Sequence, residues 1–242
     1  MFIRLLRKVH LGIYVFWVVF FFCLFYPFLY FASKNPDRHF SLIVNIRKTV
    51  AWLSTFCSGF FYKVSFSAPI DWSRTYVICP NHTSLLDISF VAIICKLDFS
   101  FMGKVELLNN PVTRIFFNTI DIPVNRLSNI SSYRAFKQAQ SRLAANKSVV
   151  IFPEGRIDDT YPPILQSFKN GPFKLAIENQ VPILPLVMRD VWKLLWDEGR
   201  KGSKPGFCRI EVLEPIETHN FKPEDADLLK DMVFRSFTTY LN

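Results

Sequence analysis

His82 and Asp87, five positions apart in the stretch CPNHTSLLD at 79–87, are the residues best suited to chemistry. An imidazole held by a carboxylate keeps one ring nitrogen free to take a proton, so the pair could act as a general base on a hydroxyl. A short β-prone segment at 75–78 precedes the histidine, and an apolar segment of helix length at 85–97 follows it. Because α/β folds usually place chemistry where a strand ends and a helix begins, the position of His82 favours catalysis.

The same spacing also has a structural explanation. Residues five apart on a regular helix point about 140° away from each other, so His82 and Asp87 converge only if His82 lies in the turn before the helix. Ser84 is a good candidate for the N-cap, and Asp87 would then complete a capping box that merely starts the helix. Thr83 and Ser84 suggest a serine hydrolase, but the sequence contains no Gly-x-Ser-x-Gly motif. This stretch alone leaves a catalytic and a capping role open.

The segment FPEGR at 152–156 is a second candidate, and it ends a run at 148–152 that is typical of a buried strand. Gly155 permits a tight turn and a close approach of the backbone. Arg156 could bind a phosphate through two hydrogen bonds, and Glu154 could accept hydrogen bonds from a polyol. The alternative is a strand and turn with an exposed ion pair. Both candidate motifs therefore follow predicted strands.

In this order and at this separation, the NHTSLLD and FPEGR motifs resemble those of the glycerolipid acyltransferase family, whose best-known bacterial members are the 1-acylglycerol-3-phosphate acyltransferases. Two weaker blocks of the family are also present, at 103–126 and at 181–186. The resemblance covers residues 75–215, and the apolar N-terminal segments resemble the two-helix membrane motif of bacterial members. It implies transfer of an acyl group from a thioester to a hydroxyl, without an acyl-enzyme.

The resemblance implies catalytic roles for the two residues of the HX4D motif. His82 would be the general base on the acceptor hydroxyl, and Asp87 would orient the imidazole and stabilise its protonated form. The thioester would be acyl-CoA or acyl carrier protein, both of which are co-substrates. We expect no cofactor and no metal ion.

The resemblance also implies an acceptor site. Glu154, Gly155 and Arg156 would shape it, and Lys104 and Arg126 would supply positive charge for a phosphate. A solvated surface position is the alternative for Lys104 and Arg126.

The second family block departs from the usual pattern of glycines and an Asp-Arg pair. Arg114 falls near a usual glycine position, and Asn125 precedes Arg126. The head group of the acceptor is therefore the least determined part of the resemblance. Pro182 and its neighbours would line the substrate cleft, and Lys169 is a further possible binding residue.

The composition indicates membrane contact. The chain has 242 residues, of which 50% are hydrophobic and 26 are Phe, and its net charge is +9. A basic surface suits anionic partners such as phospholipids or an acidic carrier. Nucleic acid is disfavoured, because the aromatic residues lie in the hydrophobic segments and not among clustered basic residues. The five scattered cysteines predict reduced thiols and a cytoplasmic-side protein.

The N-terminal region predicts two helices. Residues 11–32 carry no charge, follow a basic start and are long enough to span a bilayer. A signal peptide is disfavoured because no small-residue cleavage site follows. Residues 42–66 resemble an amphipathic helix at the interface, with an apolar face made by Trp52, Phe56, Phe60 and Phe61. A spanning anchor and a monotopic one both fit this pattern.

From residue 67 onward, short strands and helices alternate, which predicts an α/β fold with a mixed sheet flanked by helices. We expect strands at 75–79, 99–104, 122–125, 148–152, 183–188 and 207–213, and helices at 85–96, 131–146, 173–179 and 223–240. The chain then divides into an anchoring part, 1–66, and a catalytic part, 67–242.

The leading hypothesis is an acyltransferase that converts 1-acylglycerol 3-phosphate to phosphatidate at the cytoplasmic face of the inner membrane. The alternative acceptors are a lyso-aminolipid and glycerol 3-phosphate. A hypothesis of a different class is a catalytically inactive membrane-binding module. The expected partners are membrane lipids, the lysophospholipid and the acyl donor, and not nucleic acid.

Overall fold

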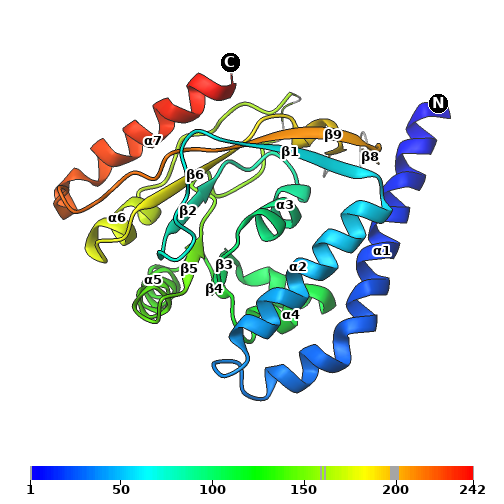
Figure 1. Ribbon diagram of the computed structural model, residues 1–242, viewed down its shortest axis with the longest axis horizontal. Coiled ribbons are helices and arrows are strands. Elements are labelled where there is room, and N and C mark those ends of the chain that lie inside the picture. The colour runs from blue at the N-terminus through cyan, green and yellow to red at the C-terminus, as the bar shows by residue number, and fades with distance from the viewer. Residues whose placement is uncertain (1, 159, 161, 197–201, 242) are drawn as a thin grey trace.

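The computed structural model describes all residues except 1, 159, 161, 197–201 and 242. A seven-stranded sheet with the order β1-β9-β6-β2-β5-β3-β4 forms its centre (Figure 1). The strands are β1 (Phe60–Phe66), β2 (Val77–Pro80), β3 (Phe99–Lys104), β4 (Ile122–Val124), β5 (Ser148–Val150), β6 (Ile183–Met188) and β9 (Gly206–Val212). Two further short strands, β7 (Leu195–Trp196) and β8 (Gly202–Ser203), pair with each other.

The sheet is mixed. Strands β2 to β6 are mutually parallel, whereas β9 is antiparallel to β6 and parallel to β1. The prediction of an α/β fold with a mixed sheet flanked by helices is therefore confirmed.

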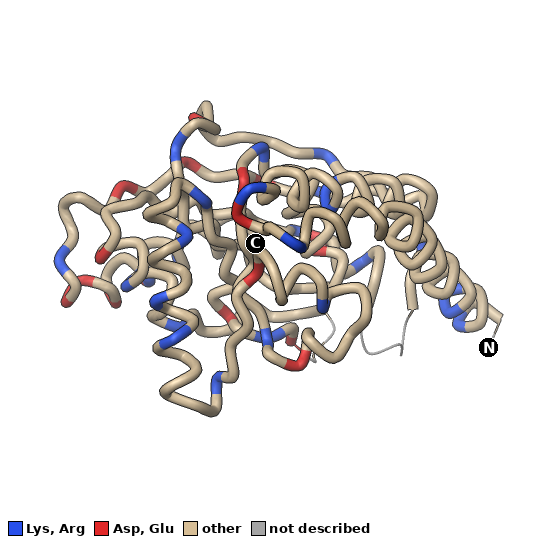
Figure 2. Tube along the Cα trace, turned by 90° about the horizontal axis from the view of Figure 1, so that it is seen from below, with Lys and Arg blue, Asp and Glu red and all other residues tan. Residues whose placement is uncertain are grey.

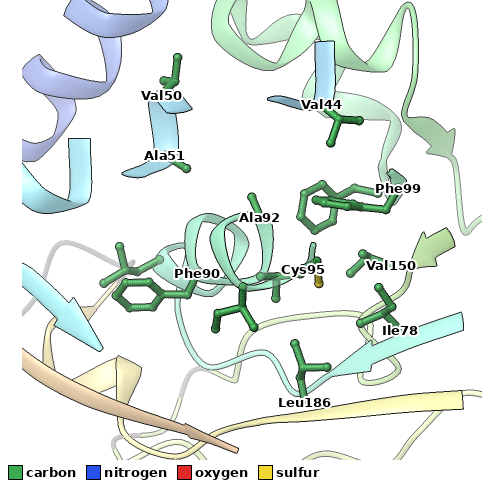
Figure 3. Close-up of a cluster of buried hydrophobic side chains, with 14 of the residues drawn as sticks. Val44, Val50, Ala51, Ile78, Phe90, Ala92, Cys95, Phe99, Val150 and Leu186 are labelled. Atoms are coloured by element: carbon green, nitrogen blue, oxygen red, sulfur yellow. The ribbon is translucent and has the colours of Figure 1, made fainter. Parts of the chain in front are cut away.

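Helices cover both faces of the sheet (Figure 1). The helices are α1 (Phe2–Ser33), α2 (Phe40–Cys57), α3 (Leu86–Ile94), α4 (Pro111–Phe117), α5 (Asn129–Ala144), α6 (Gly171–Glu178) and α7 (Ala226–Leu241), and short 3-10 turns occupy Val105–Asn109, Val191–Lys193 and Pro223–Asp225. One core joins α1 to α4 to the sheet, and a second core joins α5 to α7 to its other face. Figure 3 shows the first core, where Phe90 and Ala92 of α3 lie between α2 and the strand residues Ile78 and Leu186.

Strands β2 and β5 are neighbours, but the helices that follow them lie on opposite faces of the sheet. α3 follows β2 and packs against α2, while α6 follows β5 and packs against α7. The chain thus leaves the two strands in opposite directions, which opens a crevice at their carboxyl ends. Open α/β sheets bind ligands in such a crevice.

α2 is held to the sheet by a buried ion pair. Arg47 Nη1 lies 2.7 Å from Asp121 Oδ1, and Arg47 Nη2 donates to the carbonyl oxygen of Phe99 at 2.9 Å. A buried charge is tolerated only when it is paired and hydrogen-bonded. One side of α2 therefore belongs to the core of the α/β domain, which the amphipathic pattern did not predict.

The second helix is shorter than predicted. It ends at Cys57, and Gly59 has a φ of +68°, a conformation that favours glycine. Residues 60–66 form β1 and pair with β9, so the prediction of a helix to residue 66 is wrong. Phe60 is buried, and it does not share the exposed face of Trp52 and Phe56. The division of the chain after residue 66 stays a prediction.

In the part of the chain that the structure describes, α1 is the one helix long and apolar enough to cross a membrane. Near its start, His10 Nε2 donates to the carbonyl oxygen of Ser58 at 2.9 Å, and Nδ1 accepts from Ser203 Oγ at 2.6 Å. Near its end, Leu29 and Ala32 are buried in the first core. Both ends of α1 thus pack against the same folded unit. Basic residues occupy its N-terminal turns (Figure 2).

Candidate active site

Asn81 sets the geometry of the turn that follows β2. Its side chain accepts from the Met188 N–H at 2.6 Å and donates to the Met188 carbonyl oxygen at 3.2 Å. Asn81 is buried, so these two bonds satisfy its amide group and the backbone N–H and carbonyl groups of Met188 in the absence of water. The turn after β2 is therefore tied to the neighbouring strand immediately before His82. The spacing of the motif did not single out this role of Asn81.

Asp87 holds His82 and starts α3 with the same carboxylate oxygen. His82 Nδ1 lies 3.2 Å from Asp87 Oδ2, which also accepts from the N–H groups of Thr83 at 2.5 Å and Ser84 at 2.8 Å. Asp87 is fully buried, and His82 lies in the turn before the helix, as the hypothesis of convergence required. The carboxylate makes Nδ1 the protonated nitrogen and leaves Nε2 as the nitrogen that can accept a proton.

Ser84 is not the N-cap residue that was predicted. α3 begins at Leu86, and its N-cap is Leu85. The Ser84 hydroxyl accepts from the Leu86 N–H at 3.1 Å and donates to the carbonyl oxygen of Leu195 at 2.8 Å. It thus links the start of α3 to β7, and its hydroxyl donates to a backbone carbonyl and not to His82.

Glu154 joins the two sequence motifs. Its Oε1 accepts from the backbone N–H of His82 at 2.7 Å, and its Oε2 accepts from the backbone N–H of Gln166 at 2.7 Å. Burial raises the pKa of this carboxyl to about 7, although both N–H groups favour the ionised form. Glu154 therefore holds the turn after β2 against the long loop after β5. The motif predicted that Glu154 accepts hydrogen bonds from a polyol. Both carboxylate oxygens already accept from backbone N–H groups, so a polyol would have to share them.

Phe152 packs directly on the imidazole. The ring centroids of His82 and Phe152 are 4.0 Å apart with an interplanar angle of 25°, and Phe101 lies on the next strand with its centroid 6.5 Å from that of Phe152. Phe152 limits the orientations of the imidazole to those compatible with this contact.

A cavity of about 740 Å³ lies beside these residues at the carboxyl edge of the sheet. Phe152 stacks on the imidazole of His82 and Glu154 accepts from the His82 backbone N–H, and both residues line the cavity, so His82 lies directly behind its lining. Four basic side chains are among its lining residues: Lys104, Arg126, Arg156 and Lys169. The structure therefore brings together the three basic residues proposed for a phosphate, Lys104, Arg126 and Arg156, and Lys169, proposed as a further binding residue.

Gly155 lets Arg126 approach the loop after β5. Gly155 has a φ of +76°, and a Cβ at this position would lie 3.1 Å from Arg126 Nη1. Partial burial lowers the pKa of Arg126, and Glu106 opposes this shift. A guanidinium stays charged at neutral pH. The cavity thus keeps a fixed positive charge beside the FPEGR turn.

The unpredicted lining residues include three polar side chains, Ser132, Gln166 and Ser167. They follow no strand end and belong to no motif, so the sequence carried no signal for them. Pro182, in contrast, lies at the amino end of β6, and its carbonyl oxygen accepts from the Val77 N–H at 3.1 Å. β6 is parallel to β2, so Pro182 lies at the edge opposite His82 and the prediction that it lines the cleft is wrong.

Among the residues described, no group of three or more His, Cys, Asp or Glu side chains could hold a metal ion. The oriented imidazole of His82 is suited to proton transfer, and the pocket with its four basic side chains is suited to an anion.

A sequence model of the family described as Acyltransferase matches residues 61–189. The mouse protein named 1-acyl-sn-glycerol-3-phosphate acyltransferase alpha is 30% identical over 170 residues, which are 69% of this chain and 59% of the mouse protein. The human protein named 1-acyl-sn-glycerol-3-phosphate acyltransferase beta is 27% identical over 218 residues, 85% of this chain and 75% of the human one. The chain thus spans less than two thirds of the mouse relative.

The crystal structure of the 1-acyl-sn-glycerophosphate acyltransferase PlsC from Thermotoga maritima superposes with a TM-score of 0.80. The match covers 98% of this chain and 96% of the other, at 20% sequence identity. The whole chain, including α1 and α2, therefore shares that fold.

Proposed function

The chain belongs to the acyltransferase family, and from that premise we propose that it moves a fatty acyl group from an acyl thioester to the free hydroxyl of a lysophospholipid. The acceptor we propose is 1-acylglycerol 3-phosphate, and the product is phosphatidate. The names of the mouse and human relatives support this acceptor.

The observation that carries the proposal is the position of the His82–Asp87 pair beside a cavity lined by four basic side chains. Acylation of a phosphorylated alcohol requires a general base for its hydroxyl and a pocket for its phosphate. Phe152 stacks on the base, Glu154 accepts from the backbone N–H of the same residue, and both line the pocket, so an acceptor bound through its phosphate would carry its hydroxyl toward His82.

In the proposed reaction, His82 Nε2 takes the proton of the acceptor hydroxyl as its oxygen attacks the thioester carbonyl. The carbon–sulfur bond breaks as the ester bond forms, and the imidazolium returns the proton to the leaving thiolate. Asp87 stabilises the imidazolium between these two steps. General-base help of this kind contributes about 10²- to 10⁴-fold.

We propose that Lys104, Arg126, Arg156 and Lys169 bind the phosphate of the acceptor. These residues come from four segments: Lys104 ends β3, Arg126 follows β4, Arg156 follows β5 and Lys169 precedes α6. Arg126 and Arg156 can each make two parallel bonds to a phosphate, whereas the two lysines act as point charges. Glu154 then acts mainly by holding His82 and Gln166 in place.

We propose that the protein lies at the cytoplasmic face of the inner membrane and contacts only the leaflet on that side. α1 exposes large apolar side chains along its length, yet both of its ends pack against the same folded unit. A helix that crossed the bilayer would carry its two ends to opposite sides. A helix lying in the plane of one leaflet satisfies both observations.

The test is an assay of the detergent-purified chain with acyl-CoA and with acyl carrier protein as donors. The acceptors are 1-acylglycerol 3-phosphate, glycerol 3-phosphate and a lyso-aminolipid, and the His82→Ala variant is the control. We expect phosphatidate from the first acceptor and its loss in the variant. Transfer to another acceptor alone would replace the substrate, and a folded protein inactive on all of them would support a membrane-binding module.

A further inference from the structure

Four aromatic side chains form a continuous exposed strip from α2 onto the edge of the sheet. The ring centroids of Trp52 and Phe56 are 5.5 Å apart, those of Phe56 and Phe61 are 6.0 Å apart, and those of Phe61 and Phe207 are 5.2 Å apart. We call these four residues the aromatic strip. They come from α2, β1 and β9, so no single helix or strand produces the surface.

The strip faces outward. Phe207 is 75% exposed, Phe56 is 55% exposed, Trp52 is 48% exposed and Phe61 is 36% exposed. Single exposed apolar residues need no explanation, but four large rings in mutual contact form a patch. Such patches mark sites of contact with a protein, a ligand or a membrane.

Basic residues follow the strip along the same face of the strands. Phe61 is paired with Phe207 in the β1–β9 register, and the next pair on that face is Lys63 with Arg209. Residues two apart in a strand point to the same side, about 7 Å further along. Lys63 and Arg209 are exposed, and Arg209 also pairs with Asp190 at 2.9 Å. Along β1 and β9, the aromatic pair on this face is therefore followed directly by a pair of cationic residues.

The strip adjoins the apolar helix α1. Phe60, immediately before Phe61, packs its ring against His10 and Tyr14 of α1 with centroid distances of 5.2 Å each. In Figure 1 the ends of β1 and β9 that carry the strip lie toward α1. On α1 itself, Ile13 and Phe16 are exposed. Phe60 and Phe61 point to opposite faces of the sheet, so the strip and α1 meet at the amino end of β1 from its two sides.

From this arrangement we propose that the aromatic strip enters the bilayer interface and that Lys63 and Arg209 contact anionic lipid head groups. Aromatic rings occupy the boundary between head groups and acyl chains, and cations lie just outside it. The order of rings and cations along β1 and β9 matches that depth profile. The membrane contact therefore extends beyond the two N-terminal helices onto the β1–β9 edge of the sheet.

This inference rests on the proposed membrane association but not on catalysis. It assigns the contact to specific residues, and Phe66 supplies a matched control. Phe66 lies on β1 like Phe61 and is 49% exposed, but its side chain points to the opposite face of the sheet because it is five positions away. A probe at residue 66 and one at residue 207 therefore compare two exposed positions of the same protein.

The experiment uses the full chain with the two exposed cysteines removed, Cys23→Ser and Cys57→Ser, while the buried Cys79, Cys95 and Cys208 remain. A bimane fluorophore is attached to the Phe207→Cys variant or to the Phe66→Cys variant. Each protein is reconstituted with vesicles of phosphatidylcholine and phosphatidylglycerol. Flotation measures membrane association, and quenching by nitroxide-labelled lipid or aqueous iodide measures the environment of the probe.

We expect both proteins to float with the vesicles. The probe at residue 207 is quenched several-fold more by nitroxide lipid than the probe at residue 66, and several-fold less by iodide. Flotation with equal iodide access at the two positions would overturn the role of the strip and leave the membrane association intact. Protection from iodide without quenching by lipid would also overturn it, because a protein then covers the strip. Failure to float would overturn both proposals.

Discussion

The turn after β2 and the turn after β5 both end a parallel strand, but they are built in different ways. In the first, Asp87 binds His82, Thr83 and Ser84, all within five residues of itself. In the second, Glu154 binds the backbone of His82, 72 residues away, and of Gln166, 12 residues away. The first turn is a local motif, whereas the second is an assembly of distant segments.

The difference between the turn after β2 and the turn after β5 indicates which properties of the protein each turn controls. The carboxylate of Asp87 sets the direction of the imidazole through local hydrogen bonds, and Asn81, Phe152 and Glu154 add contacts with distant segments. The acceptor pocket, in contrast, depends on the sheet that brings β3, β4 and β5 together. We therefore expect changes in the first turn to reduce turnover, and changes in the second turn to alter stability, pH dependence and acceptor affinity.

The largest effect is expected for Asp87→Asn. The amide oxygen can still accept from the N–H groups of Thr83 and Ser84, so α3 keeps its start. The neutral amide does not stabilise the imidazolium, and we expect acyl transfer to fall by about 10²- to 10⁴-fold. Steady-state rates and thermal unfolding of the same preparation check this. A loss of Tm with retained activity would mean that Asp87 only caps the helix.

Glu154→Gln should change the pH dependence of stability. The pKa of Glu154 is raised from 4.5 to about 7, so the folded protein holds this proton more tightly than the unfolded chain. Its stabilising effect is complete below pH 4.5 and is lost as the pH rises to about 7, by on the order of 3 kcal/mol.

The glutamine variant does not titrate, so its Tm should fall less than that of the wild type between these two pH values. A constant offset between the proteins is expected as well, because the amide NH₂ faces one of the two backbone N–H groups. Parallel profiles of Tm against pH would show that Glu154 is not the titrating group.

Gly155→Ala should weaken the second turn. An L residue at φ +76° costs about 1 to 2 kcal/mol, and its Cβ would press on the guanidinium of Arg126. We expect a lower Tm and a higher KM for the acceptor, with kcat less affected. Gly12→Ala is the control, because a Cβ there meets nothing within 4 Å, its φ is not in the left-handed region, and it lies in α1 outside the cavity. Equal effects of the two changes would contradict this role of Gly155.

The smallest effect is expected for Lys104→Gln. Lys104 is exposed at the end of β3, so salt screens its charge and we expect about a three- to tenfold rise in the KM of a phosphorylated acceptor. The rise should shrink at high ionic strength. Lys137→Gln removes the same charge from the exposed side of α5 and serves as the control. An unchanged KM for Lys104→Gln would mean that Lys104 is only a solvated surface residue.

The sequence predicted which helices and strands the fold contains better than it predicted where each of them ends. The strand at 183–188 and the helix after Pro223 lie where the periodicity indicated. The second helix was extended too far, because the aromatic residues of β1 continue the apolar composition of α2. The buried role of Arg47 could not be foreseen, since its partner Asp121 is 74 residues away and the pair exists only after packing.

The residue sequence predicted the strand, the turn and the helix around His82, because the bonds of Asp87 span only five residues, whereas the contacts of Asn81 and Glu154 with this turn come from distant segments. It also determined which basic residues follow strand ends. Only the tertiary structure decided that β2 and β5 are neighbours although they are not consecutive, which brings Glu154 to His82. It also decided that Arg126 reaches Gly155 and that Pro182 lies at the opposite edge, because the order and direction of strands in a sheet are set by long-range packing and not by the residues of any one strand.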